Sequence, residues 1–304
     1  MDWSNGYIIN PDDFRNGQLL MSPFTSGYQF RNHKLWSNFL DDGLPYVTVD
    51  DRKFYITPSG TSALEAVLNQ INPAPENEVW IVTTSGNHYI SGCVTRTIEK
   101  FCRWSRQKTE KTKAILVNHE FGFVHDEVEK LTAHHLPLIE DCAYSMYSGK
   151  NGKKAGTVGD FAIFSMAKMF PVQAGGLIVS NRGLEFSGVC ETNSRKYFKA
   201  CFHYYQQQSE QIIDGRLKNF RLFEEKFGKA GLETRFEPQV GEVPGAFLFK
   251  APGWPLDELK IFLQKQGIEC SVFYGEDAFY LPCHQNMNVD HINYILTLIK
   301  FFKK

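Results

Sequence analysis

The chain has 304 residues, of which 42% are hydrophobic, 14% aromatic and 22% charged. This composition is typical of a soluble globular protein with a large and a smaller domain, and it excludes a disordered or fibrous chain. The 33 lysines and arginines nearly balance the 34 aspartates and glutamates. The net charge is therefore too small to attract nucleic acid or an anionic membrane, and any anionic ligand must be bound by a local group of residues.

Targeting and metal signals are absent from the sequence. The first residues, Met1 to Gly6, have neither a basic start nor an apolar core, so we expect no signal peptide, and no apolar run is long enough to span a bilayer. The seven cysteines form no Cys-x-x-Cys pair, which argues against a disulfide framework or a zinc site. His134, His135 and His203 lack a second ligand set, so we predict no metal. These features favour a cytoplasmic protein.

Short apolar runs alternate with amphipathic stretches through the first two thirds of the chain, which indicates an α/β fold. The predicted strands cover residues 54–57, 79–82, 114–117, 138–139, 161–164 and 177–179. Uninterrupted apolar strands are typical of a mostly parallel sheet covered by helices on both faces. Residues 54–180 are therefore expected to form the core of a large domain.

The last third of the sequence predicts a smaller α/β unit. A long helix is expected from about residue 210, followed by a strand at 246–249, a helix, a strand at 268–274 and a final helix. The residues expected to be buried on these helices are Ile213, Leu217, Phe220 and Phe227, then Leu256, Leu259 and Leu263, then Ile292, Ile295, Leu296 and Ile299. We predict a large domain of residues 1–209, and a linking helix with a small domain in residues 210–304.

The first segment that carries chemistry follows the strand at residues 54–57. Ser59, Gly60 and Thr61 stand where a helix begins, and Ser62 and Glu65 have the spacing of a capping box. Free backbone N–H groups, a hydroxyl and the positive end of a helix dipole together suit a phosphate. The alternative is an ordinary helix cap.

The second segment is a hydrophobic strand that ends in two acids. It places Asp141 at the C-terminal edge of the sheet, where ligand sites of α/β proteins lie. A carboxylate at that edge needs a partner, and an aspartate that pairs with the nitrogen of a pyridine ring keeps the ring protonated. The alternative is an aspartate that caps the next helix.

The third segment places Lys168 among apolar neighbours. Burial there is expected to favour the neutral amine, which can attack an aldehyde. Ser165 could reach the same phosphate as Ser59, and Gly175 and Gly176 allow a close backbone approach. The alternative for Lys168 is a strand-end lysine whose charged tip reaches solvent.

These segments follow the chain order of fold-type-I pyridoxal-phosphate (PLP) enzymes. The sequence resembles the PLP-dependent sugar aminotransferases of the DegT type, which act in cell-surface polysaccharide, lipopolysaccharide and antibiotic-sugar pathways. The stretches that carry the resemblance are residues 59–64, 139–143, 152–161, 164–165, 168–176, 267–274 and 281–284. The resemblance covers most of the chain and implies a fold-type-I large domain with a small C-terminal α/β domain.

The resemblance assigns roles to individual residues. It implies that Lys168 is catalytic and carries PLP as a Schiff base, and that Asp141 binds the ring nitrogen. It implies that Ser59, Gly60, Thr61 and Ser165 hold the phosphate.

Further assignments concern the ring and the substrate. Tyr89 is the residue expected to stack on the cofactor ring, with His88 as its rival. Tyr144 falls where the family usually places a glutamine or histidine near the phenolic oxygen of the ring. Asn118 and His119 match a family loop near the active site, the alternative being a polar strand end. Together with His88 they are the residues expected to contact substrate.

The implied activity is transfer of an amino group from an amino acid, with glutamate as the expected donor, to a nucleotide-linked keto-sugar. The implied assembly is a homodimer with its site at the interface. The chain departs from the family before Phe54 and in residues 181–214, where the loop that usually reaches the neighbouring subunit is not recognisable. Arg195 and Lys196 in that segment could contact phosphate, although a solvated surface is the ordinary explanation.

Three alternatives stay open. A PLP-dependent sugar dehydratase of this family tends to replace the lysine by histidine, so Lys168 argues against it. A non-catalytic scaffold that binds nucleotide-sugar would not need a lysine in an apolar setting. A nicotinamide enzyme is disfavoured because no Gly-x-Gly-x-x-Gly motif follows a predicted strand.

Overall fold

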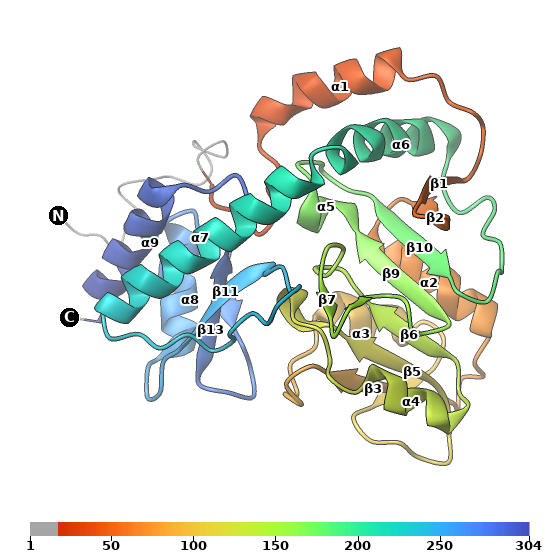
Figure 1. The fold of residues 1–304 in the computed structure, drawn as a ribbon. Coiled ribbons are helices and arrows are strands. Elements are labelled where there is room, and N and C mark those ends of the chain that lie inside the picture. The colour runs from red at the N-terminus through yellow and green to blue at the C-terminus, as the bar shows by residue number, and fades with distance from the viewer. Residues whose placement is uncertain (1–17, 304) are drawn as a thin grey trace.

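A computed structural model describes residues 18–303, and Figure 1 shows a large and a small sheet, each packed against helices. The large sheet has eight strands in the order β1-β2-β10-β9-β6-β5-β3-β4. Their bounds are Tyr46–Val49 (β1), Arg52–Thr57 (β2), Glu78–Thr83 (β3), Arg103–Ser105 (β4), Thr112–Asn118 (β5), Leu138–Asp141 (β6), Phe161–Ser165 (β9) and Gly176–Ser180 (β10).

Most neighbouring strands of this sheet are parallel. Strands β4, β3, β5, β6 and β9 run in the same direction, and β10 lies antiparallel between β9 and β2. All six strands predicted in the large domain are present, and β5, β6, β9 and β10 have the predicted runs of buried residues. The predicted fold, a mostly parallel mixed sheet flanked by helices, is confirmed.

Helices cover both faces of the large sheet because successive strand residues point to opposite sides. Helices α2 (Gly60–Ile71) and α3 (Gly92–Ile98) pack against the face that carries Ile81, Leu116 and Ile178. The other face packs against α4 (Val128–Leu131), α5 (Met166–Met169) and α6 (Thr192–Gln206), and α1 (Gln29–Asn38) lies on α6 (Figure 1).

The start of α2 differs from the prediction. Its N-cap is Ser59, whose backbone is extended and whose side-chain oxygen accepts the N–H of Ser62, so the predicted capping box of Ser62 and Glu65 is wrong. The helix begins one turn earlier because the Ser59 hydroxyl satisfies a free N–H group there. As a result, Gly60 and Thr61 are the first two helical residues.

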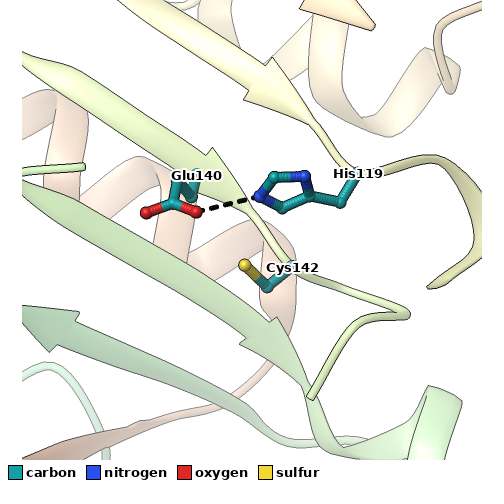
Figure 2. A group of neighbouring side chains, drawn as sticks. All are labelled: His119, Glu140 and Cys142. Carbon is teal, nitrogen blue, oxygen red and sulfur yellow. Dashed lines mark hydrogen bonds and ion pairs between the residues drawn. The ribbon is translucent and has the colours of Figure 1, made fainter. Parts of the chain in front are cut away.

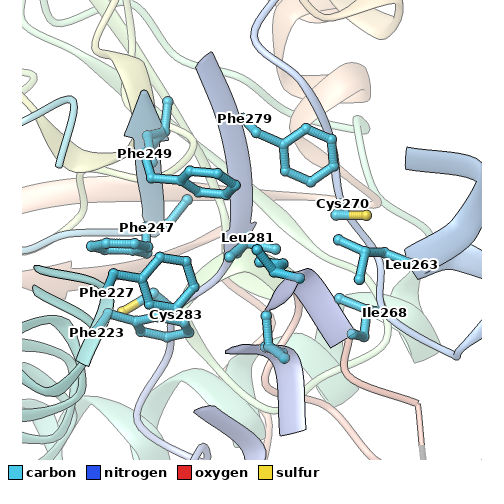
Figure 3. Packing of buried hydrophobic residues seen from close by; sticks show 14 of the residues in the cluster. Phe223, Phe227, Phe247, Phe249, Leu263, Ile268, Cys270, Phe279, Leu281 and Cys283 are labelled. Atoms are coloured by element: carbon cyan, nitrogen blue, oxygen red, sulfur yellow. The ribbon is translucent and has the colours of Figure 1, made fainter. Parts of the chain in front are cut away.

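The small sheet has the strand order β11-β13-β12 and packs against three helices. The bounds are Ala246–Lys250 (β11), Ser271–Val272 (β12), Ala278–Pro282 (β13), Ser209–Lys229 (α7), Leu256–Lys265 (α8) and Val289–Phe302 (α9). Figure 3 shows the core between them, in which Phe223 and Phe227 of α7 meet Phe247 and Phe249 of β11. A two-stranded hairpin of β7 (Gly149–Lys150) and β8 (Lys153–Lys154) lies outside both sheets.

Two predictions for this unit need correction. The buried face of α7 includes Ile212 and Phe223, whereas Ile213 and Leu217 are only half-buried, because the helix also turns polar residues inward. The strand predicted at residues 268–274 is split. Ile268 pairs with Leu19, and only Ser271–Val272 join β13, so the exposed Glu269 lies between two different partners. The predicted inward faces of α8 and α9 are confirmed.

No helix in residues 18–303 combines the length and the apolar character that crossing a bilayer requires.

Candidate active site

A cavity of about 370 Å³ lies where strands β5, β6 and β9 end. Ten of the predicted site residues line it, and they come from seven separate segments of the chain. These residues are Ser59, Gly60, Thr61, Tyr89, Asn118, His119, Asp141, Tyr144, Ser165 and Lys168. His88 does not line this cavity and is exposed to solvent, since the backbone turns it away from its neighbour Tyr89.

One wall of the cavity is the N-terminus of α2. Ser59, Gly60 and Thr61 lie there beside Ser165, and a Cβ added at Gly60 would be 3.4 Å from the Cβ of Ser165. A Cβ at Gly176 would collide with the backbone of Ser59, so glycine is required at that position. The wall therefore presents helix N–H groups and hydroxyls without intervening side chains, as an anion requires.

Asp141 lies at the bottom of the cavity with 4% of its surface exposed. Its carboxylate accepts the backbone N–H of Ala143 at 3.1 Å and the amide of Asn118 at 3.0 Å. Burial outweighs these hydrogen bonds and raises the pKa of Asp141. Within residues 18–303 no lysine or arginine pairs with Asp141, so a cationic ligand group would complete its environment.

Lys168 lies in the short helix α5 and its side chain reaches the same cavity. Burial lowers the pKa of its amine, as expected, but burial is not the largest influence. Interaction with Tyr144 is the largest influence and raises the pKa of Lys168, the Glu269 carboxylate acts in the same direction, and together they outweigh desolvation. The amine is 5.2 Å from the centre of the Tyr144 ring. Neighbours distant in the sequence thus reverse the effect expected from local apolar residues.

The backbone of Lys168 is held from the small domain by Arg216 of α7. This side chain is fully buried and donates hydrogen bonds to the carbonyl oxygens of Lys168 at 2.6 Å and Pro244 at 3.3 Å, and to Gln285 at 3.0 Å. Gln285 in turn donates to the carbonyl of Met169 at 2.8 Å. Arg216 therefore satisfies free carbonyl groups at the C-terminus of α5, where a cation is favourable.

Tyr89 lies in the aromatic part of the cavity wall. Its hydroxyl is 3.2 Å from that of Tyr280, and its ring is 6.5 Å from the ring of Phe121 at an interplanar angle of 17°. Tyr280 belongs to β13 of the small sheet, so this wall includes a residue of that sheet. The structure thus places Tyr89, and not His88, where an aromatic ring can meet a planar ligand.

Asn118 and His119 follow β5 but differ in their surroundings. Asn118 donates to Asp141. His119 is buried, and in its ring Nδ1 accepts the N–H of His125 at 3.1 Å and Nε2 is 2.9 Å from Glu140. Both ring nitrogens are occupied, and the hydrogen must lie on Nε2 because Nδ1 accepts.

Figure 2 shows His119 with Glu140 and Cys142, a group whose ligand atoms lie within 4.8 Å of one another. Such residues can bind a metal, but the Glu140 carboxylate already accepts three backbone N–H groups and the His119 ring. Burial also raises the pKa of the Cys142 thiol well above its ordinary value. The group is therefore best explained as a hydrogen-bonded support beneath Asp141.

Several cavity residues gave no sequence signal. Met21, Glu269 and Tyr280 reach the cavity from both ends of the chain, and the N–H of Met21 donates to Glu269 at 2.7 Å. Exposed Cys93 also lines the cavity. Only the pairing of the segment around Leu19 with Ile268 brings the first two together, and no local pattern reports such a contact.

The fold of the chain is similar to that of solved aminotransferases. The aminotransferase TlmJ from Streptoalloteichus hindustanus superposes with a TM-score of 0.69 at 14% identity, over 98% of this chain and 95% of that chain. Residues 105–188 match the DegT/DnrJ/EryC1/StrS aminotransferase family, which confirms the family resemblance inferred from the motifs.

Two curated relatives match parts of the chain. GDP-perosamine synthase from Vibrio cholerae is 40% identical over 82 residues, which are 25% of this chain and 22% of that protein. The pleiotropic regulatory protein from Geobacillus stearothermophilus is 31% identical over 209 residues, which are 58% of this chain and 53% of that protein. The matches thus span from about a fifth to about half of the length of these relatives.

The cavity fits the cofactor that the resemblance implies. PLP has a phosphate, a basic ring nitrogen and an aldehyde, and the cavity offers a helix N-terminus, a buried acid without a cationic partner, and a lysine. The helix N-terminus follows β2, the acid ends β6 and the lysine follows β9. The fit rests on the chemistry of these groups in this structure.

Proposed function

We propose that this protein is a PLP-dependent aminotransferase that moves an amino group from an amino acid to the carbonyl of a keto-sugar. The observation that carries the proposal is the shared cavity of Lys168 and the buried, unpaired Asp141. Two carboxylates or a lone lysine would suit other chemistry, but a lysine opposite an acid that needs a cationic ring suits this cofactor.

The residues divide the work by position. Ser59, Gly60, Thr61 and Ser165 would hold the phosphate, and Asp141 would keep the ring nitrogen protonated. Bound PLP supplies a ring that withdraws electrons from the carbon next to the amino group.

Lys168 has two tasks in this proposal. It would hold the cofactor at rest, and its free amine would take the proton from the amino acid's α-carbon and deliver it to the C4′ carbon of the cofactor. Tyr89, whose hydroxyl is 3.2 Å from that of Tyr280, would pack against the cofactor ring and limit its tilt.

The finer parts of the proposal concern substrates and setting. We propose glutamate as the donor, a nucleotide-linked keto-sugar as the acceptor and a homodimer with the site at the interface, in the cytoplasm and in polysaccharide biosynthesis. The name of the partial relative GDP-perosamine synthase supports a nucleotide-linked acceptor, and seven unpaired cysteines suit a reducing compartment such as the cytoplasm.

The test is the visible absorption spectrum of the purified chain with PLP, before and after glutamate, beside Lys168→Ala. The wild-type chain should show a band from lysine-bound cofactor that changes on addition of glutamate, and the variant should show neither. A chain that fails to bind PLP after reconstitution would refute the proposal and favour a non-catalytic scaffold.

A further inference from the structure

Tyr144, which follows β6, is the side chain with the largest effect on the pKa of Lys168. The amine is 5.2 Å from the centre of the tyrosine ring, a distance typical of a cation held against an aromatic ring. Tyr144 is half-buried and lines the same cavity. Its position three residues after Asp141 means that one short loop brings both groups to the site.

Contacts on two sides fix the Tyr144 ring. On one side the ring of Phe121 is 5.7 Å away. On the other side is Gly245, where an added Cβ would lie 2.5 Å from Cδ1 of the tyrosine. Gly245 is itself held by its N–H bond to the carbonyl of Phe121 at 2.6 Å. The space that the tyrosine occupies therefore exists because residue 245 has no side chain.

The other groups that act on the Lys168 amine are less suited to hold it. Glu269 is exposed and binds the N–H of Met21, and Cys93 is exposed. Tyr89 also faces the amine, but its hydroxyl pairs with Tyr280. Tyr144 is thus the partner that is both close and fixed by packing.

We propose that Tyr144 is a positioning residue for Lys168, which holds the protonated amine between the two proton transfers of the reaction. The inference rests on the proposed function, in which the amine carries the proton from the α-carbon of the amino acid to the C4′ carbon of the cofactor. Without a partner, the buried ammonium would lose its proton readily. The phenol oxygen and the ring face of Tyr144 stabilise the ammonium where the proton must be delivered.

The test uses Tyr144→Phe, which keeps the ring and removes the oxygen. Tyr147→Phe is the matched control, because Tyr147 lies three residues away and its hydroxyl donates to Gln206 at 2.9 Å. The full chain, freed of cofactor, is labelled with acetic anhydride over a range of pH, and acetylation of Lys168 is measured by peptide mass spectrometry. The reagent modifies only the neutral amine.

The half-labelling pH should fall by about one unit or more in Tyr144→Phe, which corresponds to about tenfold more labelling at a given lower pH. It should be unchanged in Tyr147→Phe. Gly245→Ala is a second variant, since it displaces the tyrosine ring, and it should shift labelling in the same direction. Circular dichroism and the melting temperature show that each variant is folded.

Superimposable labelling profiles for the wild type, Tyr144→Phe and Gly245→Ala would overturn the proposal. In the cofactor-loaded protein we expect Tyr144→Phe to lower kcat for the reaction with glutamate and to leave KM unchanged, and the reverse pattern would also contradict it. Failure of the wild type to bind PLP would refute the proposed function, while the labelling profiles would still decide whether Tyr144 acts on Lys168.

Discussion

Glu140→Gln tests the support beneath the site. Glu140 is buried in β6, and each of its two carboxylate oxygens accepts two hydrogen bonds. One oxygen accepts the N–H groups of Val158 at 2.8 Å and Gly159 at 2.6 Å, and the other accepts Gly156 at 2.8 Å and lies 2.9 Å from the His119 ring. In the variant, one oxygen becomes an NH₂ group. Whichever way the amide points, two donors lose their acceptor.

The magnitude follows from those two donors. A buried polar group left without a partner costs about 1–3 kcal/mol, so Glu140→Gln should lower the free energy of unfolding by about 2 to 6 kcal/mol. In a domain of this size each kcal/mol lowers the melting temperature by about 2 °C or more, which predicts a fall of roughly 4 °C at least. Glu225→Gln is the control, because Glu225 is an exposed partner of Lys229 and its loss should leave the melting temperature unchanged.

The same carboxylate predicts a dependence on pH. Its hydrogen bonds hold the pKa of Glu140 below the ordinary value of 4.5 despite desolvation by burial. A lowered pKa means that its contribution to stability is present above the unfolded pKa and is lost as the pH falls through the folded pKa. The difference between wild type and Glu140→Gln, measured by urea unfolding, should therefore shrink below about pH 4.

Two results would refute this reasoning. The first is equal stability of Glu140→Gln and wild type at neutral pH. The second is a rise in melting temperature on addition of Zn²⁺, which would mean that His119, Glu140 and Cys142 bind a metal in place of the observed hydrogen bonds.

Two further variants test the cofactor cavity. Asp141→Asn should weaken PLP binding about tenfold or more, because a hydrogen bond to a charged group contributes about 1.5–3 kcal/mol, and equal affinity in a titration would contradict the ring-nitrogen assignment. Gly176→Ala should abolish PLP binding, because the added methyl collides with Ser59, and should destabilise the chain by about 1–3 kcal/mol in urea unfolding. A Gly176→Ala chain that binds PLP like wild type would show that the α2 wall does not hold the phosphate.

The central strands β5, β6, β9 and β10 of the large sheet could be predicted because they are buried on both faces. Continuous apolar runs such as those of β5 and β9 are a local signal that survives folding. The prediction of one strand at residues 268–274 was wrong because its pairing is not a local property. Its apolar residues fit one extended strand, but its actual partners, Leu19 and β13, lie far away in the sequence.

The candidate site divides in the same way. Ser59 and Asp141 follow predicted strands, and parallel strands that end at one edge bring such residues together. The positions of Glu269 and Arg216 could not be predicted in this way, because they depend on how the elements around the small sheet pack. The pKa of Lys168 depends on such packing too, because the residue that raises it most, Tyr144, lies on another segment of the chain.

Arg216 shows how the packing of the small sheet reaches Lys168. It lies on α7, which packs in the core beside the small sheet, yet it bonds to the carbonyl of Lys168, which follows β9 of the large sheet. Because the arginine is fully buried and also bonds to the carbonyl of Pro244, it ties the backbone of Lys168 to the segment that leads into β11. The backbone position of Lys168 is therefore coupled to the packing of the small sheet through one side chain.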